Sequence, residues 1–199
     1  MPKAFSDKEK EIIRDELIKK GEEYFSRYGL KKTNISDLCE EVGIAKGSFY
    51  IFFESKESLF FTILQNFESK IREDFFLSFQ NGKKSSPEIL KDFMKKIVRN
   101  IESTPFFKLL INKDEYRQFS RKLSKEQFSS LFDSDVNFVG EIVKNVHMKE
   151  LTEEEMKYRV SLMRSVFALV LQKEIVGEEY YLKVIDTYID KAVDEFFKE

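Results

Sequence analysis

The sequence predicts an all-α protein in which a small N-terminal three-helix domain precedes a larger helical body. Apolar residues recur three and four positions apart along most of the chain, and no segment shows the two-residue alternation of a β-strand. Helix-start signals recur as well, because Ser or Thr is followed three residues later by Glu or Gln at several places. These capping boxes are Ser6 with Glu9, Ser124 with Gln127 and Thr152 with Glu155. Amphipathic helices must bury their apolar faces against one another, so a multi-helix fold follows.

The charge composition of the chain does not by itself indicate a DNA-binding protein. The chain has 199 residues, a net charge of −2 and an isoelectric point of about 5.8, so its bulk charge does not point to nucleic acid. The first 60 residues are not basic either, with 11 Lys and Arg against 12 Asp and Glu. Any DNA contact must therefore come from a few well-placed cations. These cations are Arg27, Lys31, Lys32, Lys46 and Lys56.

Cysteine use and hydropathy indicate the compartment. Cys39 is the only cysteine, so no internal disulfide can form and a reducing environment is favoured. We interpret it as a small, partly buried helix residue, with a redox switch as the alternative. The chain opens without a signal-peptide pattern and lacks the run of about 18 apolar residues that a membrane span needs. We therefore expect a cytoplasmic protein.

The first helix is predicted over residues 7–28. Ser6 caps its start, and Gly29 is expected to end it, because glycine adopts the left-handed conformation at low cost. Lys31 and Lys32 fall in the loop that follows. They are either solvated side chains or neighbours of a phosphate backbone.

Residues 33–59 predict two short helices across a tight turn, followed by the start of a third. Asn34 is expected to cap the first helix, and Gly43 to end it. The second helix is predicted over residues 46–52. The apolar face of the first helix consists of Ile35, Leu38 and Val42. This is the helix-turn-helix arrangement, whose second helix enters the DNA major groove.

The second helix and its surroundings carry side chains suited to DNA. Gly47 is small, so the backbone can approach closely. Lys46 and Tyr50 can reach phosphate, and Ser48 can reach phosphate or a base edge. Lys56 lies in the first turn of the third helix, where free N–H groups favour an anion. The predicted DNA-binding residues are Thr33, Asn34, Lys46, Gly47, Ser48, Tyr50 and Lys56. Phe49 and Phe53 are expected to pack against the preceding helices.

This motif resembles the DNA-binding domain of the TetR family of transcriptional regulators. The similarity rests on the run VGIAKGSFY at residues 42–50, with Thr33 before it and the SKE segment at residues 55–57 after it. It covers roughly residues 8–60. At Ala45 the family often has Ser or Thr, and the missing helix cap costs about 1 kcal/mol of helix stability. The resemblance implies a DNA-binding domain over residues 1–55 and a helical ligand-binding and dimerisation domain over residues 56–199.

Helical periodicity continues through the rest of the chain. A helix of about 25 residues is predicted from Ser55 to Phe79, long enough to act as a lever between the two domains. Pro87 and Pro105 occupy first-turn positions of two further helices, as proline often does. The remaining helices are predicted at residues 114–122, from residue 124 to Val146, from residue 152 until Gly177, and from about Tyr181 to Phe197.

A ligand cavity among the middle helices is implied by the family resemblance. Such pockets are mostly apolar, and the chain contains 21 phenylalanines, so an apolar or aromatic small molecule is expected. Core packing is the alternative explanation for the same residues. The predicted lining is Phe93, Ile97, Phe106, Phe107, Leu110, Tyr116, Phe128 and Phe132, with Arg117 and Asn137 as further polar candidates.

Homodimerisation through the last two helices is likewise implied by the resemblance. Their apolar faces are wider than one thin helix could cover, and a two-fold protein suits a palindromic DNA operator. The predicted interface residues are Phe167, Leu171, Tyr188, Ile189 and Phe196. Ligand binding would then release the operator, and repression is favoured over activation because the family mostly acts by occupying operators.

Two other functions fit the sequence less well. An enzyme is disfavoured because His147, the only histidine, has no partner with metal-ligand spacing and the chain lacks a nucleophile-elbow motif. No metal and no cofactor are therefore expected, and His147 is interpreted as a residue at a helix C-terminus. The second alternative is a helix-turn-helix DNA-binding protein without a ligand, whose body serves only dimerisation or protein recruitment.

Overall fold

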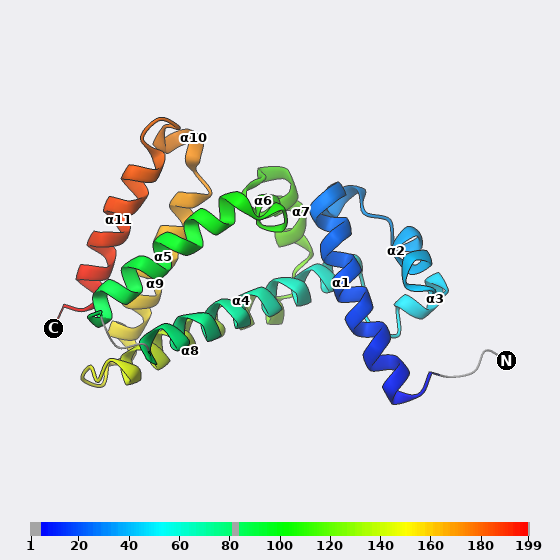
Figure 1. Ribbon diagram of the computed structural model, residues 1–199, viewed down its shortest axis with the longest axis horizontal. Coiled ribbons are helices and arrows are strands. Elements are labelled where there is room, and N and C mark those ends of the chain that lie inside the picture. The colour runs from blue at the N-terminus through cyan, green and yellow to red at the C-terminus, as the bar shows by residue number, and fades with distance from the viewer. Residues whose placement is uncertain (1–4, 81–83, 199) are drawn as a thin grey trace. The chain divides into compact units, whose positions relative to one another are not determined.

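The computed structural model describes residues 5–80 and 84–198, and within these ranges all regular structure is helical (Figure 1). This confirms the all-α prediction. None of the described helices is long and apolar enough to cross a membrane. The helices are α1 Asp7–Lys32, α2 Ile35–Val42, α3 Lys46–Phe49, α4 Lys56–Gln80, α5 Ser86–Ser103, α6 Pro105–Ile111, α7 Lys113–Lys122, α8 Lys125–Asn145, α9 Glu153–Val170, α10 Lys173–Val176 and α11 Tyr181–Phe196.

The helices form two compact units. The first contains Met1–Lys70 and Thr104–Leu123, and the second contains Ile71–Ser103 and Ser124–Glu199. Helix α4 passes from one to the other. Helices α6 and α7 belong to the first unit because both pack against α1. The functional boundary after residue 55 stays a prediction, but the packing units divide the chain elsewhere.

The core of the first unit is centred on Phe60 of α4. Its ring lies 5.3 Å from Phe25 of α1, 4.8 Å from Phe106 of α6 and 4.8 Å from Phe119 of α7, measured between centroids. All four side chains are buried. Rings at these separations are attractive beyond their buried area. Two helices from the middle of the sequence thus complete the core around the N-terminal helices (Figure 1).

Most helix ends follow the predicted signals. The three predicted capping boxes are present, each with reciprocal hydrogen bonds between cap and third residue. Two helix ends of the first unit differ from prediction. Helix α1 continues to Lys32 across a kink at Gly29, where φ is 79°, so Lys31 and Lys32 lie in a helical turn rather than a loop. Helix α3 ends at Phe49, three residues earlier than predicted.

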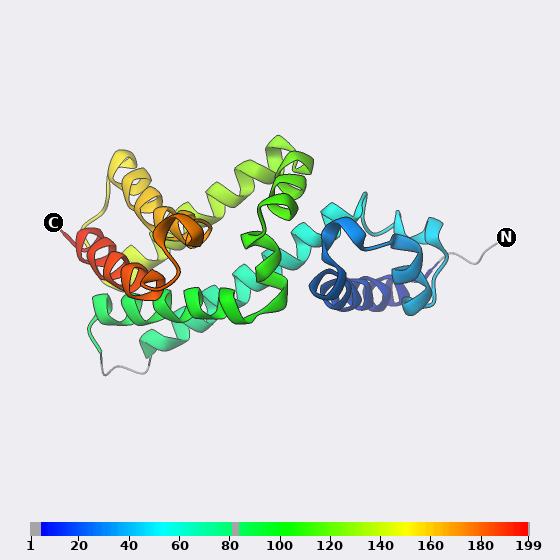
Figure 2. The same ribbon diagram turned by 90° about the horizontal axis from the view of Figure 1, so that it is seen from above.

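The second unit packs α11 against α9 and α5 (Figure 2). Its core includes Phe75, Val160, Ile185 and Ile189. Across its surface, cations of α5 face carboxylates of α11 at four-residue intervals. The pairs are Lys91 with Asp194 at 2.5 Å, Lys95 with Asp190 at 2.6 Å and Arg99 with Asp186 at 2.7 Å.

The chain between α9 and α11 departs from the predicted single helix. Helix α9 ends at Val170, and a separate short helix, α10, precedes Gly177. His147 lies just beyond the end of α8 with φ of 54°, a left-handed conformation that suits a helix C-terminus. Its predicted place after a helix end is therefore correct.

Candidate nucleic-acid interface

Local hydrogen bonds shape the turn between α2 and α3. The Asn34 side chain accepts from the Ser36 amide at 2.9 Å and donates to Asp37 at 3.1 Å, which confirms the predicted cap. At the other end Gly43 has φ of 76° and ψ of 30°, the left-handed conformation expected of a helix-ending glycine. The Ile44 amide then bonds to the Cys39 carbonyl at 2.9 Å. These bonds set the direction in which α3 leaves α2.

Helix α3 is held by its aromatic residues rather than by a cap. Ala45 provides no side-chain hydrogen bond at its start. Phe49 and Phe53 are buried, as predicted, with their centroids 5.9 Å apart. Around Gly47 the space is open, because a Cβ atom placed there would have no heavy atom within 4 Å. The free face of α3 can therefore come close to another molecule.

Arg14 of α1 is a residue that sequence reasoning missed. Its guanidinium donates to the Phe52 carbonyl at 3.3 Å and lies 4.7 Å from the centre of the Phe53 ring. Both contacts fasten the segment after α3 to α1. An isolated arginine on a helix gave no signal for this, because its partners lie 38 residues later.

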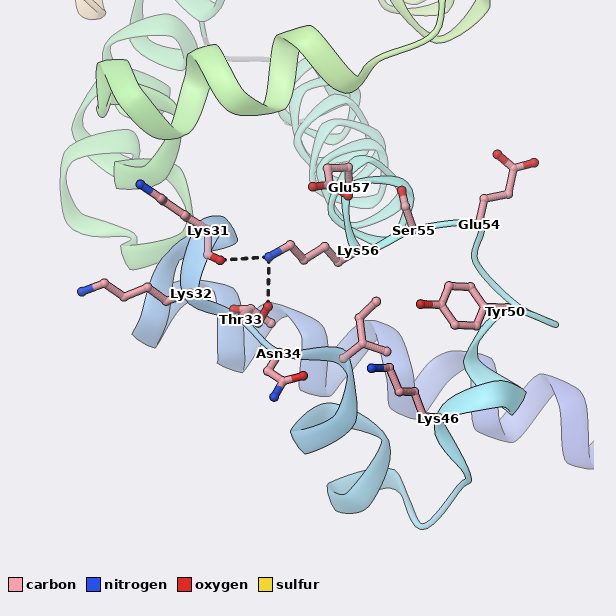
Figure 3. Close-up of a pocket in the computed structure, with 11 residues that line it drawn as sticks. Lys31, Lys32, Thr33, Asn34, Lys46, Tyr50, Glu54, Ser55, Lys56 and Glu57 are labelled. Atoms are coloured by element: carbon pink, nitrogen blue, oxygen red, sulfur yellow. Dashed lines mark hydrogen bonds between the residues drawn. The ribbon is translucent and has the colours of Figure 1, made fainter.

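An open depression of about 470 Å³ lies beside α3 and the start of α4 (Figure 3). It is lined by four lysines and two glutamates, with polar and aromatic side chains between them. The lining residues are Lys31, Lys32, Thr33, Asn34, Ile35, Lys46, Tyr50, Glu54, Ser55, Lys56 and Glu57. Five of the seven predicted DNA-binding residues thus meet here, whereas Gly47 and Ser48 lie outside the lining.

Lys56 closes one side of the depression. Its ammonium donates to the carbonyl oxygens of Lys31 and Thr33, both at 3.0 Å (Figure 3). An ammonium has three donors, so one remains for a phosphate. Lys56 therefore shapes the surface as well as offering charge to it.

Thr33 was predicted to bind DNA, but its side chain is not available for that role. The residue is only 4% exposed, and its hydroxyl donates to the Gly29 carbonyl at 2.7 Å. The hydroxyl is therefore engaged inside the protein. Thr33 contributes to the surface through its main chain and through the turn that it stabilises.

Cys39 of α2 is buried beneath this surface. Burial raises the pKa of its thiol above the ordinary value, and the nearby charge of Lys46 opposes this only in part. A raised pKa keeps the thiol protonated, which favours the structural role over a redox role.

The predicted ligand-lining residues divide between the two units. Phe93 and Ile97 belong to the second, where the Phe93 ring lies 4.5 Å from Phe75. Phe106 and Phe107 belong to the first and are buried there. Tyr116 is exposed, as are Arg117 and Asn137. The side chains of Leu110, Phe128 and Phe132 lie outside the described part of the structure.

The predicted dimer interface is corrected at two positions. Ile189 and Phe196 are fully buried within the second unit, so their side chains are not available to a partner. Phe167 is 37% exposed, and Leu171 and Tyr188 are half-buried. The helical period placed all five on apolar faces but could not separate inward from outward positions. Other exposed apolar side chains of this region are Ile175, Tyr180, Leu182 and Val184.

Among the described residues, no group of three or more His, Cys, Asp or Glu side chains is arranged to hold a metal ion.

Comparison with known proteins agrees with this geometry. Residues 17–63 match the family model described as bacterial regulatory proteins, tetR family. The uncharacterized HTH-type transcriptional regulator YvdT of Bacillus subtilis is 38% identical over 66 residues, which is 33% of this chain and 31% of YvdT. The chain thus spans about a third of the length of the curated relatives it matches.

Two solved structures resemble the chain over most of its length. A TetR transcriptional regulator from Rhodococcus sp. RHA1 has a TM-score of 0.67 at 16% identity, covering 95% of this chain and 98% of that one. Thermus thermophilus FadR, a TetR family transcriptional repressor in complex with lauroyl-CoA, has a TM-score of 0.66 at 14% identity, covering 94% and 95%. Both establish a shared fold.

Proposed function

Because the chain belongs to the TetR family of bacterial regulatory proteins, we propose that it is a transcriptional regulator that binds double-stranded DNA through α2, α3 and the lysine-lined depression. The matched segment, residues 17–63, contains α2, α3 and every residue that lines the depression. The segment that matches the family model is therefore the segment that forms the lysine-lined depression.

The observation that carries this proposal is the open face of α3 next to the lysines. The space around Gly47 would let the α3 backbone enter a groove. The Lys46 and Tyr50 side chains line the depression beside α3 (Figure 3), where both could reach phosphates. Phosphate contacts orient a protein on DNA, and groove contacts select the sequence. Ser48, which follows Gly47 on α3, is the side chain that we propose for the second role.

We further propose that the protein binds a palindromic operator as a homodimer. A two-fold pair of α3 helices matches two-fold related half-sites. The exposed apolar residues near the C-terminus support an association surface there, since large apolar side chains at a surface often mark contact sites. Phe167, Leu182 and Val184 are exposed on α9 and α11 and are candidates for it.

A small apolar or aromatic effector that releases the operator completes the proposed function. The apolar residues of the C-terminal helices support it, and the FadR neighbour carries lauroyl-CoA, a ligand with a long apolar chain. Repression follows if operator occupancy itself blocks transcription. Turnover of a substrate has no part in this mechanism.

One observation favours a regulator without an effector. Phe106 and Phe107 were predicted to line a ligand cavity, yet both are covered by other side chains, with Phe67 5.2 Å from Phe106 and 5.0 Å from Phe107 between ring centroids. Thermal unfolding with a panel of fatty acyl and aromatic compounds separates the two functions. A ligand that binds the folded state raises the midpoint in proportion to its concentration.

Selection from a random double-stranded DNA pool tests the central proposal. The purified protein is expected to enrich a palindrome with half-sites about one helical turn apart, or a multiple of it. A variant in which Lys46 and Tyr50 are both changed to Ala should enrich nothing, while keeping the wild-type unfolding midpoint. Failure of the wild-type protein to enrich any sequence, after extraction of bound small molecules, would refute DNA-binding regulation.

A further inference from the structure

The last turn of α1 is interrupted in a way that exposes two amides. Gly29 has φ of 79° and ψ of 164°, outside the helical region, and the helix resumes for Leu30, Lys31 and Lys32. The first N–H groups of any helical turn lack acceptors within the helix. After the Gly29 kink, the amides of Leu30 and Lys31 are in that position.

A carboxylate from α7 satisfies both amides. One oxygen of Glu115, Oε2, accepts from Leu30 N at 2.8 Å and from Lys31 N at 3.2 Å. Gly29 suits this place for two reasons: its φ of 79° is a conformation that side chains rarely adopt, and a Cβ atom there would lie 2.7 Å from the other oxygen, Oε1, so the carboxylate would have to shift. The kink thus provides two amide donors for a carboxylate that lies 85 residues later in the sequence than Leu30.

Helix α7 is itself well anchored, so it can hold Glu115 in place. The Asn112 side chain caps α7 by accepting from the amides of Asp114 and Glu115, at 3.0 and 3.1 Å. One turn after Glu115, Phe119 is buried against Phe60. A capped, core-anchored helix presents its first-turn carboxylate in one direction.

Lys56 binds the carbonyl oxygens of the same turn. Glu115 binds its amides, while the Lys56 ammonium binds the carbonyl oxygens of Lys31 and Thr33. This turn, residues 30–33, carries two lysines of the depression and leads directly into Asn34, the cap of α2. Its position therefore determines where both the lysines and α2 lie.

We propose that Glu115 is a positioning residue for DNA binding, through which α7 holds the turn at residues 30–33 in the geometry that DNA requires. This rests on the proposed function and names a control point for it. A displacement of α7 would withdraw the carboxylate, free two amides and loosen the turn. DNA affinity would then fall although every residue proposed to touch DNA keeps its identity.

Whether removal of Glu115 weakens or strengthens DNA binding distinguishes a positioning role from an effect of its negative charge. Glu115 is an anion close to Lys31, so its removal should strengthen DNA binding if bulk charge alone matters. Positioning predicts weaker binding. Asp114 provides the matched control, because it is an exposed carboxylate one residue away in the same first turn of α7.

The test compares Glu115→Ala, Glu115→Gln and Asp114→Ala on the DNA selected with the wild-type protein. We expect Glu115→Ala to bind about tenfold more weakly than Asp114→Ala, and Glu115→Gln to recover most of the loss. The Gln oxygen can accept from both amides, since one oxygen of Glu115 already accepts both. In the absence of DNA, hydrogen exchange at Leu30 and Lys31 should accelerate in Glu115→Ala but not in Asp114→Ala.

The outcomes are distinguishable from failure of the proposed function. Wild-type protein that binds no DNA overturns the regulator function and the positioning role together. Wild-type protein that binds, with Glu115→Ala equal to or tighter than Asp114→Ala, overturns positioning alone. If Glu115→Ala does not fold, Glu115→Asp decides, because it keeps the charge but shortens the side chain that reaches Leu30 N and Lys31 N. Accelerated exchange at both amides with weaker DNA binding supports positioning, and wild-type behaviour in DNA affinity and amide exchange overturns it.

Discussion

The guanidinium of Arg14 donates to the carbonyl oxygen of Phe52 at 3.3 Å, which joins α1 to the segment that follows α3. The same group lies over the Phe53 ring. We predict that Arg14→Ala lowers the free energy of unfolding by about 1 kcal/mol, because an exposed cation–π contact contributes about 0.5–1 kcal/mol and the hydrogen bond adds to it. Chemical denaturation measures the change. Arg14→Lys keeps the charge but should recover only part of the loss, and full recovery would contradict a role for the planar guanidinium.

Tyr50 is predicted to contact phosphate through its hydroxyl. The residue is 53% exposed and lines the depression. Tyr50→Phe should weaken binding to operator and to random DNA equally, by about fivefold, since one hydrogen bond contributes about 1 kcal/mol. Titrations at fixed salt concentration measure both. Tyr28→Phe, which removes an exposed hydroxyl outside the depression, should leave both affinities unchanged.

Gly47 is predicted to matter for DNA approach and not for folding. Its Cβ position is open, so Gly47→Ala should raise helix stability by up to about 1 kcal/mol while weakening operator binding at least tenfold. Thermal unfolding and a DNA titration of the same sample measure the two effects. Gly21→Ala should behave in the opposite way, because its Cβ would lie 2.8 Å from Leu59 Cδ2 in the core. Unchanged DNA affinity in Gly47→Ala would mean that α3 does not approach DNA closely there.

Cys39 should be unreactive in the native protein. Burial raises the pKa of its thiol, so at pH 7–8 even less thiolate is present than in an exposed cysteine. A disulfide reagent should label it slowly in buffer and rapidly in denaturant. Complete labelling of the folded protein within minutes would instead support a redox switch. DNA affinity should be the same before and after mild oxidation.

The ion pair between Lys91 of α5 and Asp194 of α11 predicts that part of the stability depends on pH. The hydrogen bond from Lys91 lowers the pKa of Asp194, with a smaller opposing effect of desolvation. A lowered pKa means that the pair contributes stability above the unfolded value of about 3.9 and loses it as the pH falls through the folded value. Asp194→Asn should therefore lower the unfolding midpoint at pH 7, and by less as the pH falls below the unfolded value. Asp74→Asn, an exposed carboxylate of α4 in the same unit, should have little effect across the same pH range.

Short-range features of the N-terminal unit were predicted correctly because they depend on neighbours in the sequence. Asn34 bonds to an amide two residues later, and Gly43 ends α2 through its own backbone freedom. The outcome at Gly29 was only half anticipated. The glycine does break the helix, but the chain returns to helical geometry immediately.

Features that depend on distant partners were not predictable in this way. Periodicity placed Ile189 and Phe196 on an apolar face, yet only packing shows that this face is already covered by the same chain. Thr33 resembled a DNA contact by position, but its hydroxyl turns inward to Gly29. No sequence pattern singled out Glu115, because its partners Leu30 and Lys31 lie 85 and 84 residues earlier in the chain.

The sequence by itself determined the all-α architecture, the helix-turn-helix and the family, because helical periodicity, caps and turn glycines act over a few residues and are written in consecutive positions. Tertiary structure alone decided that α6 and α7 join the N-terminal unit and that Glu115 and Lys56 grip the turn before α2. Those contacts join residues 23 to 85 positions apart. Their formation depends on how whole helices pack around Phe60, and no local pattern encodes that arrangement.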